Sequence, residues 1–209
     1  MKGYTKIIES STILTFLEHI FGAQIPLALD YIQIMYLYPW QKLPALILFS
    51  KENGTGKSTF GKLMKIIFRD NCAIVSSYDF TGDFNNKWAT KKLIVCDEAK
   101  LDRVAVIEKV KELNRSEKIT VHTQGKYPYD MDCYLSFVLL SNFDPFIYTN
   151  SESNSFWRVQ VPSLAKENPS QLTIMANEIP AFVSFLVNRE LSTKNQSVLW
   201  FHPSLYTKA

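Results

Sequence analysis

Leu48-Phe49-Ser50-Lys51-Glu52-Asn53-Gly54-Thr55-Gly56-Lys57-Ser58-Thr59 has the residue types of a phosphate-binding loop, in the order that such a loop requires. It follows the apolar run 45–49, which is typical of a buried strand, and it precedes apolar residues at helical spacing in 60–67. In a strand–turn–helix of this kind, backbone N–H groups surround phosphate oxygens and the helix N-terminus adds its positive dipole. The segment therefore predicts a nucleotide site.

Each residue of the loop has an expected role. The residues expected to contact the nucleotide are Asn53, Gly54, Thr55, Gly56, Lys57, Ser58 and Thr59. Lys57 would reach the outer phosphates, and the hydroxyl of Ser58 would bind Mg²⁺. The pattern G-x-x-x-x-G-K-[ST] places a glycine where this chain has Lys51. The alternative is a chance Gly-Lys-Ser in a strand-to-helix turn, and the flanking strand and helix patterns favour the nucleotide site.

Two acids follow the apolar run 93–96. Asp97 would hold Mg²⁺ through its water shell, and Glu98 would orient and deprotonate an attacking water molecule. Adjacent carboxylates are also common where a strand enters a loop, so the pair alone is a weak signal. Its position downstream of Lys57 turns it into strong support for a nucleotide hydrolase.

Asn142 and Arg158 are further candidates for the same chemistry. Asn142 ends another apolar strand, where a polar side chain would face the ligand crevice of a parallel sheet. Its alternative role is that of a turn-forming asparagine. Arg158 enters a strand. From one subunit, its side chain would neutralise negative charge on the γ-phosphate that is bound to a neighbouring subunit. Its alternative is an ordinary edge-strand arginine beside Trp157.

A hairpin is expected between Ile119–Val121 and Cys133–Phe137. His122, Lys126 and Tyr127 would lie at its tip. Lys126 would contact a phosphate of single-stranded nucleic acid, with His122 or Tyr127 stacking on a base. A solvated lysine in a turn is the alternative.

The bulk composition is that of a globular protein with a sizeable core, with 46% hydrophobic and 21% charged residues over 209 positions. A net charge of +3 excludes a nucleic-acid-binding field over the whole surface, so any such contact is local. The three cysteines lack metal-ligand spacing and suggest reduced thiols in a cytoplasmic protein. Neither a transmembrane segment nor a signal peptide is expected, because Asp30 and Gln33 interrupt the longest apolar stretch, 25–40.

Strands alternate with helices along the chain, which predicts an α/β fold with a three-layer sheet. Two helices are expected in 10–38 and a helical part from about 170 to 191. The expected organisation is an N-terminal helical segment (1–40), a core (41–165) and a C-terminal helical segment (166–209) within the same domain.

Several segments together resemble superfamily-3 helicases, and in particular the ATPase domains of bacteriophage and plasmid primase-helicases. They are Glu52-Asn53-Gly54-Thr55-Gly56-Lys57-Ser58-Thr59-Phe60, Phe84-Asn85-Asn86-Lys87-Trp88-Ala89, Asp97-Glu98, Val121 to Lys126, Ser141-Asn142 and Phe156-Trp157-Arg158-Val159. Segments 38–44 and 178–182 also look like parts of this family. The resemblance extends over about 38 to 187, most of the chain.

The resemblance implies a modified AAA+ P-loop core, with a five-stranded parallel sheet between helices, an N-terminal helical segment and a β-hairpin before the sensor strand. It also implies a hexameric ring with ATP between subunits and hairpins lining the channel. By position, Asn142 matches the polar sensor, Lys126 falls in the hairpin motif and Arg158 lies near the arginine finger. Relatives often carry an arginine pair where this chain has a single Arg158.

The leading hypothesis is therefore an ATP-dependent helicase or translocase acting in replication of phage, plasmid or other mobile DNA. It would use ATP and Mg²⁺ and move on single-stranded DNA, with RNA not excluded. The expected partners are copies of the same chain and a primase domain or protein, and no membrane. The expected location is the cytoplasm of a bacterial cell or phage-infected host. Its rivals are a nucleotide-binding replication scaffold or switch with little hydrolysis, and a small-molecule kinase built on the same loop.

Overall fold

The computed structural model describes residues 11–99, 104–144, 155–164 and 168–192. Within them, five strands form one sheet in the order β2-β3-β6-β1-β7, and every neighbouring pair is parallel. The strands are β1 (Ala45–Phe49), β2 (Cys72–Val75), β3 (Leu93–Cys96), β6 (Ser136–Ser141) and β7 (Phe156–Gln160). The expected α/β fold with a five-stranded parallel sheet is confirmed.

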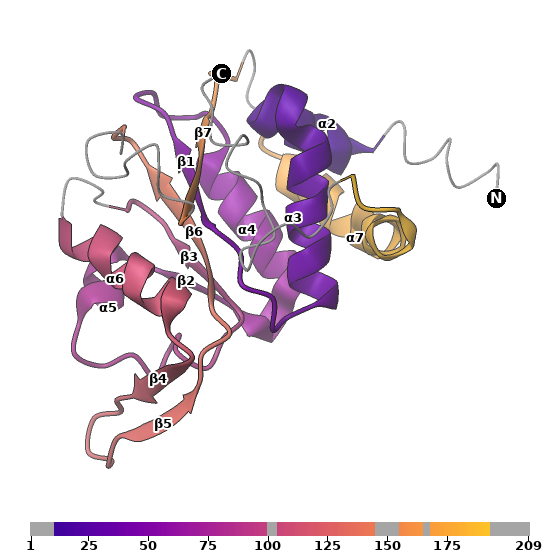
Figure 1. The fold of residues 1–209 in the computed structure, drawn as a ribbon. Helices are drawn as coiled ribbons and strands as arrows, with labels where there is room; N and C mark the ends of the chain where they lie inside the picture. The colour runs from indigo at the N-terminus through magenta and orange to yellow at the C-terminus, as the bar shows by residue number, and fades with distance from the viewer. Residues whose placement is uncertain (1–10, 100–103, 145–154, 165–167, 193–209) are drawn as a thin grey trace.

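Helices cover both faces of this sheet (Figure 1). One face is covered by α2 (Thr12–Phe21), α3 (Ile25–Leu37), α4 (Lys57–Phe68) and α7 (Gln171–Asn188). The other is covered by α5 (Ser77–Thr81) and α6 (Val104–Arg115). The short 3₁₀ turns η1 (Gly22–Gln24) and η2 (Arg69–Asn71) follow α2 and α4. The chain is a three-layer α/β domain.

Alternation along the strands divides the core between these two layers. In β1, Leu46 and Leu48 pack towards α2, α3, α4 and α7, whereas Ala45 and Ile47 pack towards α5 and α6. Nearly all of these strand residues are buried, as expected for parallel strands with helices on both faces. The apolar runs seen in the sequence are therefore explained by burial on both sides.

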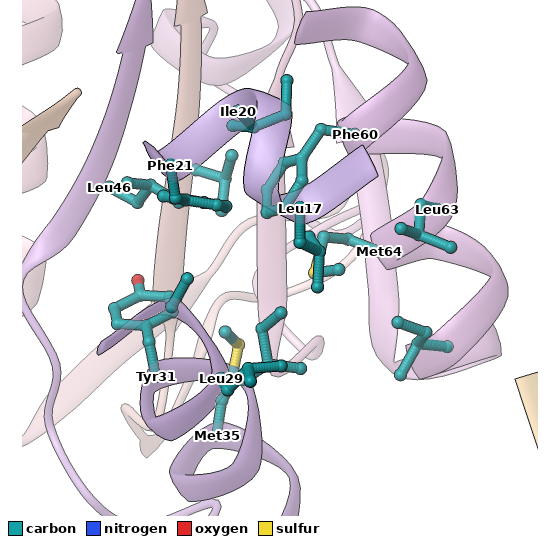
Figure 2. Close-up of a cluster of buried hydrophobic side chains, with 14 of the residues drawn as sticks. Leu17, Ile20, Phe21, Leu29, Tyr31, Met35, Leu46, Phe60, Leu63 and Met64 are labelled. Atoms are coloured by element: carbon teal, nitrogen blue, oxygen red, sulfur yellow. The ribbon is translucent and has the colours of Figure 1, made fainter. Parts of the chain in front are cut away.

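The two N-terminal helices belong to the core of the domain. Figure 2 shows Leu17, Ile20 and Phe21 of α2 beside Phe60, Leu63 and Met64 of α4. Thr12–Leu37, spanning α2, η1 and α3, is long and apolar enough to cross a membrane by length and composition alone. Its apolar side chains instead contact the sheet and the neighbouring helices, which accounts for that composition.

Polar contacts fasten both N-terminal helices to α7. The Glu178 carboxylate of α7 accepts hydrogen bonds from the Ser11 hydroxyl and from the first backbone N–H groups of α2. Arg189, just after α7, forms a 2.6 Å ion pair with the fully buried Asp30 of α3. A buried carboxylate is stable when it is paired and hydrogen-bonded in this way.

The predicted hairpin is present, but its second strand differs from the expected one. The two antiparallel strands are β4 (Lys118–Val121) and β5 (Tyr129–Asp132). Residues 133–135, which we expected in the second hairpin strand, lie between β5 and β6. Cys133 N donates to the Glu117 carbonyl at 2.8 Å, and Cys133 and Leu135 are buried whereas Tyr134 is exposed. The hairpin precedes β6, and so it lies at the amino-terminal edge of the sheet, at the bottom of Figure 1.

Candidate nucleotide-binding site

The loop between β1 and α4 is tightly wound and depends on glycine. Gly54 and Gly56 have φ values of 67° and 96°, which a residue with a side chain rarely adopts. A Cβ atom at Gly56 would also lie 3.0 Å from Phe16 Cε2. The Gly56 carbonyl accepts the first hydrogen bond of α4, from Phe60 N at 2.8 Å. The loop therefore ends directly at the N-terminus of a helix.

Lys57 lies buried inside this loop. Its Nζ is 3.1 Å from Thr55 Oγ1, 3.1 Å from the Glu52 carbonyl oxygen and 3.5 Å from the Ser50 carbonyl oxygen. Burial lowers the pKa of the Lys57 ammonium, and the nearby Asp97 opposes this shift. A cation that has lost part of its hydration and has the Asp97 carboxylate nearby is well placed to attract the further negative charge of a phosphate.

Ser58 and Asp97 meet across the crevice between α4 and β3. The Ser58 hydroxyl donates to Asp97 Oδ1 at 3.1 Å. Mg²⁺ is usually bound by one or two carboxylates, a hydroxyl and the phosphates of its ligand, so these two oxygens suit it. Among the described residues there is no group of three or more His, Cys, Asp or Glu side chains that could hold a metal ion without such a ligand.

Glu98 follows in a strained backbone conformation. Its φ is 53°, unusual for a residue other than glycine, asparagine or aspartate. The turn is held by Glu98 N, which donates to Asp97 Oδ1 at 3.1 Å, and by the Ser77 hydroxyl, which donates to the Glu98 carbonyl at 3.3 Å. This turn places the exposed Glu98 beside Asp97 at the same crevice.

Asn142 joins the loop from the end of β6. Its Nδ2 donates to Asn53 Oδ1 at 3.3 Å. Beside it, Ser50 N donates to the Ser141 carbonyl at 3.2 Å, so the carboxyl ends of β1 and β6 converge here. A cavity of about 190 Å³ results, lined by Asn53, Gly54, Thr55, Gly56, Lys57, Ser58, Thr59, Asp97, Glu98, Leu140 and Asn142. Every residue expected in the loop, the acid pair and Asn142 therefore lines one cavity.

A second cavity of about 380 Å³ adjoins the first and shares Gly54, Gly56 and Thr59 with it. Its other lining residues are Lys62, Leu164, Asn168, Pro169, Gln171 and Leu172. They combine apolar surface with amide groups, as small-molecule sites do. Sequence reasoning missed this cavity, because its wall comes from the start of α7, far from the loop along the chain.

Sequence reasoning also missed two side chains that hold the loop from outside. His19 Nε2 of α2 lies 3.0 Å from the Thr55 carbonyl oxygen. The Ser163 hydroxyl, after β7, donates to Glu52 Oε2. Neither residue belongs to a local motif, so only the fold could reveal them.

Four candidate residues lie away from this cavity. Arg158 is in the middle of β7, paired in register with Ile47, and alternation places it on the same face as Phe156, towards α6. His122, Lys126 and Tyr127 are exposed on the hairpin at the opposite edge of the sheet. Tyr127 is 97% exposed. Within one chain, the structure therefore brings neither Arg158 nor the hairpin to the loop.

Asn85 ties the hairpin to the segment that precedes β3. Its Oδ1 accepts from His122 N at 2.7 Å and its Nδ2 donates to the Thr120 carbonyl at 2.8 Å. His122 is thus held through its backbone, while the residue itself is exposed. The hairpin is therefore attached to the segment before β3 next to its turn, at the end of β4.

Comparisons with known proteins agree with this fold. A model of a family of unknown function (DUF5906) matches residues 48–158. No curated protein matches the chain at a significant level. Two apo structures of the C-terminal region of NrS-1 superpose on this chain with a TM-score of 0.75 at 15% identity. The match covers 87% of this chain and 46% of theirs, so the chain spans less than half of their length.

Proposed function

We propose that this chain, which belongs to the family of unknown function DUF5906, is the ATPase domain of a nucleic-acid helicase or translocase. The observation that carries the proposal is the cavity in which Lys57, Ser58, Asp97, Glu98 and Asn142 meet. Three separate elements contribute these side chains at the carboxyl edge of a parallel sheet, where ligands of α/β proteins bind. Replication of phage, plasmid or other mobile DNA is the proposed setting.

The two adjoining cavities support a nucleoside triphosphate as the ligand. The smaller one offers the loop amides, the N-terminus of α4 and Lys57 to phosphates. The larger one offers Leu164 and Leu172 to an aromatic base, with the Asn168 and Gln171 amides beside them. Because the cavities share Gly54, Gly56 and Thr59, one molecule would reach both.

The residues of the smaller cavity have complementary roles in hydrolysis. Lys57 and the loop amides would hold the β- and γ-phosphates, and Ser58 and Asp97 would hold Mg²⁺, which neutralises phosphate charge. Glu98 would accept a proton from the attacking water, and Asn142 would orient that water or the γ-phosphate. Glu98 is exposed on the open side of the cavity, where water has access.

The position of Arg158 supports an oligomer. It lies on the edge strand β7 and on the face away from its own loop, so only a neighbouring copy would present it to a γ-phosphate. We propose a homo-oligomer, of which a hexameric ring is the closed form that the resemblance implies. Single-stranded DNA would contact Lys126, Tyr127 and His122, with RNA not excluded.

The partners and location follow from the same proposal. A replication motor of this type would work beside a primase domain or protein, in the cytoplasm of a bacterial cell or phage-infected host. The proposal includes no membrane, and the packing of apolar side chains of Thr12–Leu37 in the domain core supports this.

The test is the rate of ATP hydrolysis with and without single-stranded DNA. Lys57→Ala should abolish hydrolysis in both conditions, because the phosphates lose their buried cation. Lys126→Ala should keep the basal rate and lose stimulation by DNA. Lys118→Ala, an exposed lysine at the base of the same hairpin, is the matched control and should behave as wild type.

Two results would contradict the proposal. Full hydrolysis by Lys57→Ala would remove the loop from the reaction. Tight ATP binding by the wild-type chain with no turnover at any protein or DNA concentration would favour the nucleotide-binding scaffold or switch instead.

A further inference from the structure

We infer that His19 is a positioning residue of the phosphate loop, which holds the Thr55–Gly56 peptide so that its N–H group faces the ligand. The inference rests on the proposed function, because it assumes that the loop binds phosphate. His19 lies in the last turn of α2 and belongs to no phosphate-loop motif. Its role would therefore be specific to the way in which this chain packs α2 against the loop.

The contact fixes the direction of one peptide group. A carbonyl oxygen only accepts, so His19 Nε2, 3.0 Å from the Thr55 oxygen, must carry the hydrogen. In a planar trans peptide the C=O and the following N–H point in opposite directions. When His19 holds the Thr55 carbonyl on the α2 side, the Gly56 N–H is directed away from α2, and Gly56 is one of the residues that line the cavity.

Two other side chains of α2 pack against the same peptide at Gly56. A Cβ atom at Gly56 would lie 3.0 Å from Phe16 Cε2 and 3.4 Å from Ile20 Cδ1. Phe16, His19 and Ile20 are spaced three and four apart, so they occupy one face of the helix. The loop therefore packs on the apolar side chains of Phe16 and Ile20, and His19 Nε2 donates a hydrogen bond to it beside them.

The other end of α2 is fixed as well. Glu178 of α7 accepts hydrogen bonds from Ser11 Oγ at 2.7 Å and from Thr12 N and Ile13 N at 3.1 Å each. Burial alone would raise the pKa of the Glu178 carboxyl, and these hydrogen bonds outweigh it and lower the pKa. Since α2 is held at its N-terminus and packed along its length, His19 acts from a rigid support.

Removing the imidazole should affect the loop more than the fold. His19 is half-buried, whereas α2 contributes to the core through other side chains, namely Ile13, Phe16, Leu17, Ile20 and Phe21. Thr55 itself is 1% exposed, and its hydroxyl contacts Lys57 Nζ at 3.1 Å. A Thr55 peptide that rotates would therefore disturb both a loop amide and the lysine.

The experiment compares wild type, His19→Leu and His19→Gln by calorimetric titration with ATP·Mg²⁺ and with inorganic tripolyphosphate. His19→Leu should weaken both ligands about three- to tenfold, the worth of one lost hydrogen bond. His19→Gln, whose Nε2 can donate from a similar position, should recover most of the affinity. Glu18→Ala, an exposed neighbour on α2, is the control and should match wild type.

Each outcome decides the inference. A His19→Leu protein that binds both ligands as tightly as wild type overturns it, and so does an equal loss in the Leu and Gln variants. Weakening of ATP but not of tripolyphosphate also contradicts it, since His19 would then act away from the phosphates. A wild-type chain that binds neither ligand removes the proposed function itself.

Nitrogen-15 NMR of the histidine rings provides a second test that needs no variant and no ligand. His19 should carry its hydrogen on Nε2 over the pH range in which the ring is neutral. A neutral ring protonated on Nδ1 would be unable to donate to Thr55 and would overturn the inference.

Discussion

Lys57 and Lys92 show how one physical effect, burial of an ammonium group, serves two different purposes. Burial lowers the pKa of both side chains. Lys57 lies next to Asp97 inside the loop, where it would meet phosphate. Lys92 lies just before β3 and donates to the Tyr134 carbonyl at 2.8 Å, so it holds the segment between the hairpin and β6. The buried Lys57 is therefore placed to bind a ligand, whereas Lys92 stabilises the fold.

Lys92 makes the stability of the domain depend on pH. Burial, with a smaller contribution from the positive charge of Lys42, lowers the pKa of Lys92 from 10.5 to about 7, and Cys133 partly opposes this. Between these pKa values the unfolded chain binds the proton and the folded chain does not. The free energy of unfolding should therefore rise with pH from about 7 to 10.5.

Urea unfolding of wild type and Lys92→Met at a series of pH values measures this effect. The difference in free energy of unfolding between the two proteins should change between pH about 7 and 10.5, because only wild type carries the titrating Lys92 amine. Parallel curves would show that Lys92 keeps an ordinary pKa in the folded state.

At the scale of single residues, sequence identified the groups that chemistry requires and missed those that support them. Lys57, Ser58, Asp97 and Asn142 follow strands, so their convergence could be expected from the rule for parallel sheets. His19 and Ser163 reach the loop from α2 and from the segment after β7. Such contacts depend on how elements pack, and spacing along the chain does not encode them.

Among the elements, α4 approaches the sheet unusually closely because of Gly61. A Cβ atom there would lie 2.9 Å from Val95 Cγ1 and 3.0 Å from Leu140 Cδ1. Both neighbours belong to the tightly packed central strands β3 and β6. The loop and α4 are continuous, so this contact also sets where the N-terminus of α4 lies.

Gly61→Ala should therefore destabilise the domain, by about 1–3 kcal/mol, since extra volume in a packed core forces side chains or backbone to shift. Chemical denaturation would measure the loss, with Thr15→Ala on the exposed side of α2 as a control for substitution in a helix. If Gly61→Ala were as stable as wild type, the close packing of α4 on β3 and β6 would be wrong.

Two local elements escaped prediction for clear reasons. Strand β5 reads Tyr-Asp-Met-Asp and is mostly exposed, so it lacks the apolar pattern that marks a strand. Residues 133–135, where Cys133 and Leu135 are buried on either side of an exposed Tyr134, carry such a pattern but lie outside the strand. Helix α5 is only five residues long, and its signal is the cap that Ser76 Oγ provides to Asp79 N at 3.1 Å. Both β5 and α5 depend on side-chain hydrogen bonds or tertiary contacts more than on a periodic pattern of apolar residues.

For the whole molecule, the candidate phosphate site and the exposed hairpin lie at opposite edges of one sheet (Figure 1). Helix α6 and strand β6 connect the two edges, since the hairpin joins the end of α6 to the start of β6. A motor of the proposed kind would transmit a change at Asn142, after β6, along this strand and helix to Lys126. The expected three-layer fold was derived from the alternation of strands and helices, but the strand order came only from the structure.

The proposed function requires that a triphosphate bind with Mg²⁺ between the loop and Asp97. Calorimetric titration of the wild-type chain with ATP, with and without Mg²⁺, alongside Asp97→Asn, tests this claim. We expect one site per chain, with affinity that falls when Mg²⁺ is removed and falls similarly in Asp97→Asn. An absence of binding heat in all conditions, or Mg²⁺-dependent affinity that Asp97→Asn leaves unchanged, would contradict it.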